Sequence, residues 1–471
     1  MTDLRVRDLS GRRVVVWGYG AEGRAAVNLL QRHCQPTSIN VVVDTEAAVP
    51  VDAPVAVLHG HEADRVVEAA EVIVKSPGVS PHVGRLANAK TYAVVTGGTA
   101  LWFAETQGNG TIAVTGSKGK STTTSLIAHL LTAVGVPVTL AGNVGRALLD
   151  VLEEELSDPS KALDETRPHT YALELSSFQT AEVHHSPAVG VLTALFPEHL
   201  DWHGSVQRYY ADKCNLFAHR PGSALVANFD NANVKNQCAG SLVGSPLVTP
   251  YGTTEGLHVY GASIVDADGS MIFDVSSMAL VGRHNAVNVC GALSALRCFG
   301  IDIESNRTEL QLALDSFVPL EHRLQPVGFH RERLVIDDSL STAPQAAVAA
   351  LAAFADRPVG IIVGGHDRGL DYAPLAEAVA LRTVPTWVLG VPMSGERIIP
   401  LIEEALRKAH NTAVVVETFD DFDAAVHRCA DVVPAGGVLL LSPAAPSFGR
   451  FTNYRDRGMH FRTLLGLATP S

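Results

Sequence analysis

The sequence predicts an α/β protein of three domains, each an open, mostly parallel sheet with flanking helices. Its 471 residues are too many for one ordinary domain and suit about three. Short apolar runs alternate along the whole chain with amphipathic segments of helical length, a pattern typical of strands joined by crossover helices. Several of these runs end in glycine-rich turns. We therefore expect domains over residues 1–106, 107–317 and 318–471.

The first domain begins with a nucleotide-binding pattern. An apolar strand over 13–17 is followed by Gly18, Gly20 and Gly23 in the spacing G-x-G-x-x-G, and then by a helix. The next strand ends at Asp44, about where a ribose-binding acid lies in dinucleotide-binding folds. By itself this pattern would suit an NAD-dependent oxidoreductase, but it serves any nucleotide diphosphate. A further strand is expected over 91–95, and a turn-rich stretch over 107–110 is expected to link this domain to the next.

The second domain opens with the most informative turn in the chain. A β-branched strand over 111–114 leads into a turn and a helix over 122–134. In such a turn, backbone N–H groups and the helix N-terminus point at a phosphate, a lysine supplies positive charge, and a hydroxyl can bind Mg²⁺. The alternative is a glycine turn that caps a helix, and Val114 stands where the common P-loop has its first glycine. The order of strand, glycines, lysine, hydroxyl and helix favours a P-loop, made of Gly116, Ser117, Lys118, Gly119, Lys120, Ser121 and Thr122.

Two further polar residues follow or interrupt apolar strands of this domain. Glu174 lies inside the run 171–175, and a buried carboxylate needs a metal or a cationic partner. The alternative for Glu174 is an edge strand on which the side chain faces water. His199 follows the strand 189–195, at the sheet edge where catalytic groups collect, so it is a candidate ligand or acid–base group, although many histidines are structural.

Composition excludes several classes of protein. The formal net charge is −13 and no basic run occurs, so nucleic acid is not expected as a partner. Six cysteines without a CxxC pair argue against zinc and disulfides and suit a reducing cytoplasm. The polar N-terminus has no signal-peptide core, and no apolar run is long enough to cross a membrane. We expect a cytoplasmic protein with small-molecule substrates and no membrane partner.

Taken together, the motifs resemble those of the Mur ligases. The family's order is matched by Thr115-Gly116-Ser117-x-Gly119-Lys120-Ser121, Glu174-Leu175-Ser176-Ser177-Phe178-Gln179, His199-x-Asp201, His284-Asn285-x-x-Asn288, His322-Arg323, Ser442-Pro443 and Asn453-Tyr454-x-x-Arg457-Gly458. The resemblance spans all three domains and is strongest to the ligases that add glutamate to UDP-N-acetylmuramoyl-L-alanine. It implies a UDP-sugar-binding Rossmann-like domain, a central P-loop ATPase domain and a C-terminal Rossmann-like domain that binds glutamate, with no nicotinamide.

The resemblance also implies a reaction and the residues that carry it. ATP would phosphorylate a substrate carboxylate, and the amine of glutamate would then displace phosphate from the acyl phosphate. Catalytic roles fall on Lys120, Glu174, His199 and Lys213. Two Mg²⁺ ions are implied, one held by Ser121 and Glu174 and the other by His199 and a carbamylated Lys213. Without the resemblance, Lys213 would be interpreted as a solvated helix lysine.

Other residues match substrate contacts of the family. The positions for ATP are Asn285, Asn288, Arg323 and Asp338; those for the muramoyl group are Asn143 and Ser176; that for uracil is Thr45; those for glutamate are Thr342, Arg368, Ser447 and Tyr454. The chain is expected to act as a monomer.

One departure from the family bears on the amino-acid substrate. The glutamate-adding ligases commonly have a lysine where this chain has Leu340, and several motifs resemble a subgroup that adds L-glutamate. The sequence thus favours L-glutamate, with D-glutamate as the alternative. A folate polyglutamate ligase, an NAD-dependent oxidoreductase and a noncatalytic nucleotide-binding switch are the more distant alternatives.

Overall fold

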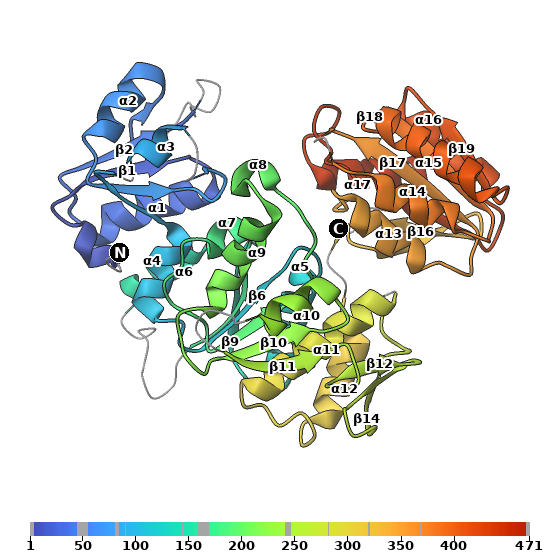
Figure 1. The fold of residues 1–471 in the computed structure, drawn as a ribbon, viewed down its shortest axis with the longest axis horizontal. Helices are drawn as coiled ribbons and strands as arrows, with labels where there is room; N and C mark the ends of the chain where they lie inside the picture. Colours follow the sequence, from blue (N-terminus) through green and yellow to red (C-terminus); the bar gives the residue numbers. More distant parts are fainter. Residues whose placement is uncertain are drawn as a thin grey trace. The chain divides into compact units, whose positions relative to one another are not determined.

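The computed structural model describes residues 4–44, 55–80, 84–89, 91–143, 145–158, 169–240, 246–280, 282–318, 321–367 and 370–467. The chain divides into two compact units (Figure 1). The first comprises Met1–Val275 and Val287–Leu314, and the second comprises Ser276–Ala286 and Asp315–Ser471.

The first sheet is five-stranded, and its paired strands are all parallel, in the order β3-β2-β1-β4-β5. Its strands and helices are β1 (Arg13–Trp17), α1 (Ala21–His33), β2 (Ser38–Val42), β3 (Val57–Leu58), α2 (Gly60–Glu68), β4 (Val72–Lys75), α3 (Gly84–Ala89), β5 (Val94–Gly97) and α4 (Gly98–Thr106). Residues of β1 alternate between two cores: Val14 and Val16 pack with α1, whereas Val15 and Trp17 pack with α2. This sheet is therefore covered by helices on both faces.

The glycine pattern after β1 has the geometry that its spacing predicts. Gly18 has a φ of 95°, in the region that glycine tolerates best. A Cβ on Gly23 would lie 2.0 Å from the carbonyl oxygen of Gly18, so only glycine lets α1 approach β1 this closely. Strand β5 begins later than the expected strand over 91–95, because residues 91–93 form a turn and Gly97 still pairs with Lys75.

The second sheet is six-stranded and parallel, in the order β11-β10-β9-β6-β8-β7. Its elements are β6 (Thr111–Thr115), α5 (Lys120–Ala133), β7 (Val138–Gly142), α6 (Leu148–Ser157), β8 (Thr170–Glu174), α7 (Ser177–Thr180), β9 (Val189–Leu192), α8 (Leu200–His203), α9 (Val206–Cys214), β10 (Ala224–Asn228), α10 (Ala232–Ala239) and β11 (Leu247–Tyr251). Strand β6 lies in the middle of the sheet with every residue buried. The turn that follows it therefore opens at the centre of the carboxyl edge.

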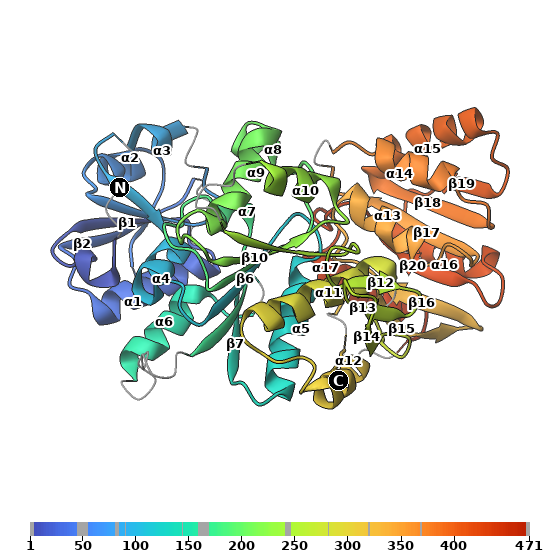
Figure 2. The same ribbon diagram turned by 60° about the horizontal axis from the view of Figure 1, so that its bottom comes forward.

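A small antiparallel sheet follows the second parallel sheet along the chain and was not predicted from the sequence. It comprises β12 (His258–Tyr260), β13 (Ser263–Val265) and β14 (Met271–Asp274), and it is followed by α11 (Arg283–Cys298) and α12 (Arg307–Ser316), as Figure 2 also shows. Tyr260 and Met271 on it are mostly exposed. Its short strands lack the long apolar runs that made the parallel strands recognisable.

The third sheet is six-stranded, in the order β15-β16-β20-β17-β18-β19, and only β15 runs antiparallel among these strands. Its elements are β15 (Gln325–His330), β16 (Arg333–Asp337), α13 (Pro344–Ala352), β17 (Val359–Gly365), α14 (Ala373–Ala380), β18 (Thr386–Met393), α15 (Gly395–Ala409), β19 (Val414–Thr418), α16 (Phe422–Val432), β20 (Val438–Leu441) and α17 (Tyr454–Leu464). Helices α13 to α15 pack on one face, and α16 and α17 on the other. The predicted fold class is confirmed: three mostly parallel sheets with flanking helices.

Candidate active site

The turn between β6 and α5 has the backbone of a phosphate-binding loop. Gly116 and Gly119 have φ values of 148° and 89°, which L side chains rarely adopt. A Cβ on Gly116 would lie 2.1 Å from Oγ1 of Thr193, at the start of the loop after β9. Thr193 Oγ1 in turn donates to the carbonyl oxygen of Lys118 at 2.6 Å. The loop is thus held from the neighbouring strand, and the N-terminus of α5 lies directly behind it.

Two lysines meet at one carbonyl group of this loop. Nζ of Lys120 and Nζ of Lys213 each donate to the carbonyl oxygen of Gly116 at 2.8 Å. Lys120 also donates to the carbonyl oxygen of Ser117 at 3.1 Å. Burial, and then repulsion from Lys120, lower the pKa of Lys213 well below its usual value of 10.5. Lys213, on α9, is therefore a buried amine that contacts the P-loop and not a solvated helix lysine.

The other lysine of the loop, Lys118, is paired with a carboxylate that was not among the predicted site residues. Nζ of Lys118 lies 2.7 Å from Oε1 of Glu198, just before His199. Burial opposes ionisation of Glu198, but Lys118 and then Lys120 lower the pKa of this carboxyl below its usual value. Ser117 is likewise fixed, because its Oγ lies 2.8 Å from the hydroxyl of Tyr209. Ser121 is partly buried and Thr122 buried in the first turn of α5.

Glu174 is buried as the sequence predicted, at the carboxyl end of β8, with 1% of its surface exposed. Its Oε1 accepts from Nδ2 of Asn143 at 2.8 Å. Its Oε2 is buried and has no hydrogen-bond partner within the described ranges. An unpartnered carboxylate oxygen is costly to bury, so this atom is placed for a cation or a donor that comes from outside the chain.

His199 and Ser176 lie in the segments after β9 and β8. His199 is exposed with φ at 54°, and its ring centroid lies 4.8 Å from that of Phe178. Ser176 caps α7, where its Oγ accepts from the backbone N–H of Gln179. Asn288, on α11, approaches the loop: its Oδ1 would lie 2.6 Å from a Cβ on Gly119. Asn285, also on α11, is buried.

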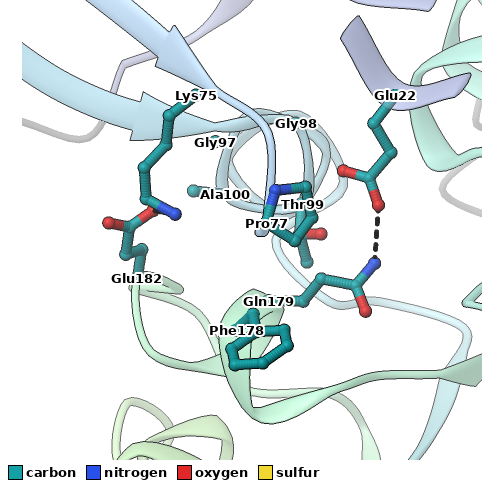
Figure 3. Close-up of a pocket in the computed structure, with 10 residues that line it drawn as sticks. All are labelled: Glu22, Lys75, Pro77, Gly97, Gly98, Thr99, Ala100, Phe178, Gln179 and Glu182. Atoms are coloured by element: carbon teal, nitrogen blue, oxygen red, sulfur yellow. Dashed lines mark hydrogen bonds and ion pairs between the residues drawn. The ribbon is translucent and has the colours of Figure 1, made fainter. Parts of the chain in front are cut away.

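A small pocket lies beside these elements in the first unit (Figure 3). On one of its sides Lys75, at the end of β4, lies 3.2 Å from Glu182; on another, Gln179 donates to Glu22 at 2.9 Å. Burial raises the pKa of Glu22, although the bond from Gln179 and the charge of Lys75 oppose this. The pocket is lined by Glu22, Lys75, Pro77, Gly97, Gly98, Thr99, Ala100, Phe178, Gln179 and Glu182. None of these residues was among the predicted site residues.

The second unit gathers its predicted residues at the carboxyl edge of the third sheet. Asp338 follows β16, where Oδ2 accepts from Oγ of Ser442 at 2.7 Å and Oδ1 from the N–H of Leu324 at 3.0 Å. Burial raises the pKa of Asp338 to about 6, while Ser442 and the partly buried Arg323 oppose the rise. Burial, and then the charge of Arg323, lower the pKa of His284 to about 4.

The described residues that match glutamate contacts lie in the segments that follow β16 and β20, two neighbouring parallel strands of this sheet. Thr342 is partly buried ahead of α13, and Ser447 is buried after β20. Tyr454 begins α17, and its carbonyl oxygen accepts from Oγ of Ser339 at 2.8 Å. Arg457, which the sequence analysis quoted only as part of a motif, donates to Ser339 from the same helix. Thr45 and Arg368 lie outside the described residues.

No helix in the ranges described is long and apolar enough to span a membrane. Within those same ranges, no three histidine, cysteine, aspartate or glutamate side chains gather in a way that could hold a metal ion.

The fold and the P-loop are typical of a nucleotide-binding enzyme, and the comparisons with known proteins show its family. The family model of the Mur ligase middle domain matches residues 114–296. The chain is 43% identical to a UDP-N-acetylmuramoyl-L-alanine–L-glutamate ligase of Micromonospora sp., over 97% of each chain. It is 41% identical to the ligase of the same name from Salinispora tropica, over 97% of this chain and 98% of the relative. The chain therefore belongs to the Mur ligase family.

Solved structures show the same fold at low identity. A MurF ligase from Thermotoga maritima in complex with ADP aligns with a TM-score of 0.55 at 16% identity, over 98% of this chain and 97% of that one. UDP-N-acetylmuramate–alanine ligase MurC from the same organism aligns with a TM-score of 0.54 at 16% identity, over 96% and 98% of the two chains. The chain thus has the Mur ligase fold over nearly its whole length, and as a member of this family it is a ligase that uses ATP.

Proposed function

We propose that this enzyme joins L-glutamate to UDP-N-acetylmuramoyl-L-alanine, with hydrolysis of ATP to ADP and phosphate, in peptidoglycan synthesis. The observation that carries the proposal is the 43% identity, across 97% of the chain, to a relative that bears this name. The two lysines of the P-loop, Lys118 and Lys120, support it, because positive charge beside such a loop suits a transferring phosphoryl group.

The reaction has two steps. The carboxylate of the substrate's L-alanine attacks the γ-phosphorus of ATP, which forms an acyl phosphate and releases ADP. The amine of glutamate then attacks the acyl carbon, loses a proton, and phosphate leaves from the tetrahedral intermediate. Loop amides and Lys120 bind the phosphates, and Lys120 offsets the charge on the transferred group. Catalysis consists mainly of positioning and charge neutralisation.

The donor set fits magnesium. Glu174 Oε2 is buried at the sheet edge without a partner in the described structure, and oxygen atoms are the ligands that Mg²⁺ prefers. Glu174 and Ser121 would hold one ion, and His199 with a modified Lys213 a second. A bound Mg²⁺ would supply positive charge for the phosphoryl transfer.

Lys213 fits the carbamate that the resemblance implies. An amine must be unprotonated to add CO₂, and burial together with Lys120 favours that form of Lys213. The carbamate would carry a negative charge and oxygen donors, and it would lie beside Lys120, which would relieve the repulsion between the two lysines.

The remaining residues sort by substrate. The UDP-sugar would bind to the first domain, ATP to the second and glutamate to the third, with the domains over 1–106, 107–317 and 318–471. Asn285, Asn288, Arg323 and Asp338 would contact ATP; Asn143 and Ser176 the muramoyl group; Thr45 the uracil; Thr342, Arg368, Ser447 and Tyr454 the glutamate. The enzyme would act as a cytoplasmic monomer, without nucleic-acid or membrane partners.

The choice of L-glutamate rests on two observations. Relatives from Micromonospora sp. and Salinispora tropica carry the L-glutamate name, and Leu340 replaces the lysine that glutamate-adding ligases commonly have. The test is kcat/KM for L- and D-glutamate with UDP-N-acetylmuramoyl-L-alanine, followed as phosphate release. We expect a preference for L-glutamate of at least about a hundredfold, or ~3 kcal/mol. A preference for D-glutamate would refute the assignment.

A folate ligase is the second candidate. FolC from Escherichia coli, in complex with DHPP and ADP, aligns with a TM-score of 0.51 at 17% identity over 74% of this chain, which speaks for a shared fold. Phosphate release that needs the UDP-muramoyl substrate and fails with a folate would separate the two candidates.

A further inference from the structure

A buried chain of hydrogen bonds joins three elements near the P-loop. Nδ1 of His203 lies 2.7 Å from Oδ2 of Asp212, and Nε2 of the same ring lies 3.0 Å from Oγ of Ser177. Asp212 also accepts from Nε of Arg208 at 2.9 Å. Because an ionised carboxylate can only accept, Nδ1 of His203 donates to Asp212. The second ring nitrogen is then left for the hydroxyl of Ser177.

The arrangement is not that of a nucleophilic hydrolase. Ser177, His203 and Asp212 are 2%, 4% and 4% exposed, and none of them lines the pocket beside them. A serine nucleophile needs a substrate within reach of its oxygen. These three side chains therefore hold the structure around the site and do not react with substrate.

Aromatic rings fix the imidazole in place. The ring of His203 stacks on Phe178 with centroids 5.6 Å apart and planes 12° apart. Tyr209 meets it edge-on at 5.1 Å, and Trp202 packs against it at 4.5 Å. With the ring held in this way, its two nitrogens define the separation between Ser177 on α7 and Asp212 on α9.

The two partners of His203 each stand next to proposed functional residues. Ser177 follows Ser176, the proposed muramoyl contact, and it begins the turn from which Gln179 reaches Glu22 in the pocket. Asp212 precedes Lys213, whose amine bonds the carbonyl oxygen of Gly116. His203 is the side chain that bonds both neighbours directly.

We propose that His203 is a positioning residue that sets the substrate-binding turn α7 against the lysine-bearing helix α9. It touches no reacting atom. Its bond to Ser177 holds the turn that binds the UDP-muramoyl substrate, and its bond to Asp212 holds Lys213 at the P-loop. The inference rests on the proposed function, because both ends are named by their proposed roles.

Two substitutions separate the two bonds. The amide nitrogen of asparagine stands as many bonds from Cβ as Nδ1 does, so His203→Asn keeps the partner for Asp212 and leaves Ser177 without one. Glutamine reaches as far as Nε2, so His203→Gln keeps the bond to Ser177 and loses that to Asp212. We expect His203→Asn to raise KM for UDP-N-acetylmuramoyl-L-alanine about tenfold with kcat almost kept, and His203→Gln to lower kcat about tenfold with that KM almost kept, as for loss of one buried hydrogen bond.

A smaller substitution tests the same hydrogen bond with less risk that the variant fails to fold. Ser177→Ala removes one hydroxyl and should raise the same KM as His203→Asn does, and adding it to His203→Asn should produce no further rise. Ser186→Ala is the matched control: Ser186 is 1% exposed, and its Oγ accepts from the N–H of His219 at 2.9 Å, ahead of β9 at the opposite edge of the sheet. It should leave both constants unchanged.

The outcomes are distinct. The opposite split between KM and kcat in the two His203 variants supports the proposal. Unchanged constants, or a loss of kcat alone that is equal in His203→Asn, His203→Gln and Ser177→Ala, would overturn it. Wild-type enzyme that releases no phosphate with the muramoyl substrate, L-glutamate and ATP would instead refute the proposed function, whatever the variants do.

Discussion

Asp338→Asn should stabilise the second unit while it weakens the enzyme. The carboxyl of Asp338 is 4% exposed and hydrogen-bonded to Ser442 and to the N–H of Leu324. Asparagine is nearly the same shape and can serve both partners, so the substitution removes a buried negative charge and little packing. Arg323 and Asp337 are the charged groups that act on this carboxyl most directly.

The magnitude follows from the shift in the pKa of Asp338, from its ordinary value of 3.8 to about 6 in the folded protein. Because the folded state holds the proton more tightly than the unfolded state, the cost of ionisation is absent below about pH 4, grows between pH 4 and 6, and is complete above pH 6. A shift of roughly two pK units corresponds to about 3 kcal/mol. Asp338→Asn should therefore gain up to about 3 kcal/mol over wild type at pH 8, and almost nothing at pH 4.

The assay is thermal unfolding of both proteins from pH 4 to pH 8, without nucleotide. The difference in Tm should open between pH 4 and 6 and then stay constant, because only this group differs between the two proteins. Activity at pH 8 should fall, since the carboxylate is proposed to contact ATP. A Tm difference that is independent of pH, or a less stable variant at pH 8, would refute the inference that the ionised carboxylate of Asp338 is costly to bury.

Three further predictions concern the first unit. Lys120→Ala should abolish ATP turnover with the Tm almost unchanged; wild-type turnover would remove the P-loop assignment. Lys213→Ala should be nearly inactive and be partly restored by acetate or propionate, which can refill the place of a carbamate, and full activity without them would contradict the modified-lysine site. Lys75→Met should cost about 2 kcal/mol because it leaves the partly buried Glu182 without its cation. Adding Glu182→Leu should recover much of that loss, and equal stability of the single variant and wild type would show that the pair contributes nothing.

The sequence was sufficient for the features that depend on neighbouring residues. The strand, the turn with Gly116 and Gly119, and the helix behind it follow each other within a short stretch, so local spacing predicts the P-loop. The parallel sheets were predictable because buried strands need continuous apolar runs. Short strands without such runs, as in the small sheet over 258–274, left no comparable signal.

Contacts between polar groups that are distant in sequence depend on how the chain packs. Lys213, which only the resemblance to the family selected in advance, lies far from the P-loop in sequence, and nothing in its own helix marks it as the buried amine that bonds Gly116. The same holds for Glu198 against Lys118, and for His203 between Ser177 and Asp212. Hydrogen bonds and ion pairs form over about 3 Å, so they depend on how helices pack on the sheet after the chain has folded. The nucleotide-binding loop and its sheets can therefore be predicted from local sequence patterns, whereas the charges and hydrogen bonds that surround the loop depend on packing.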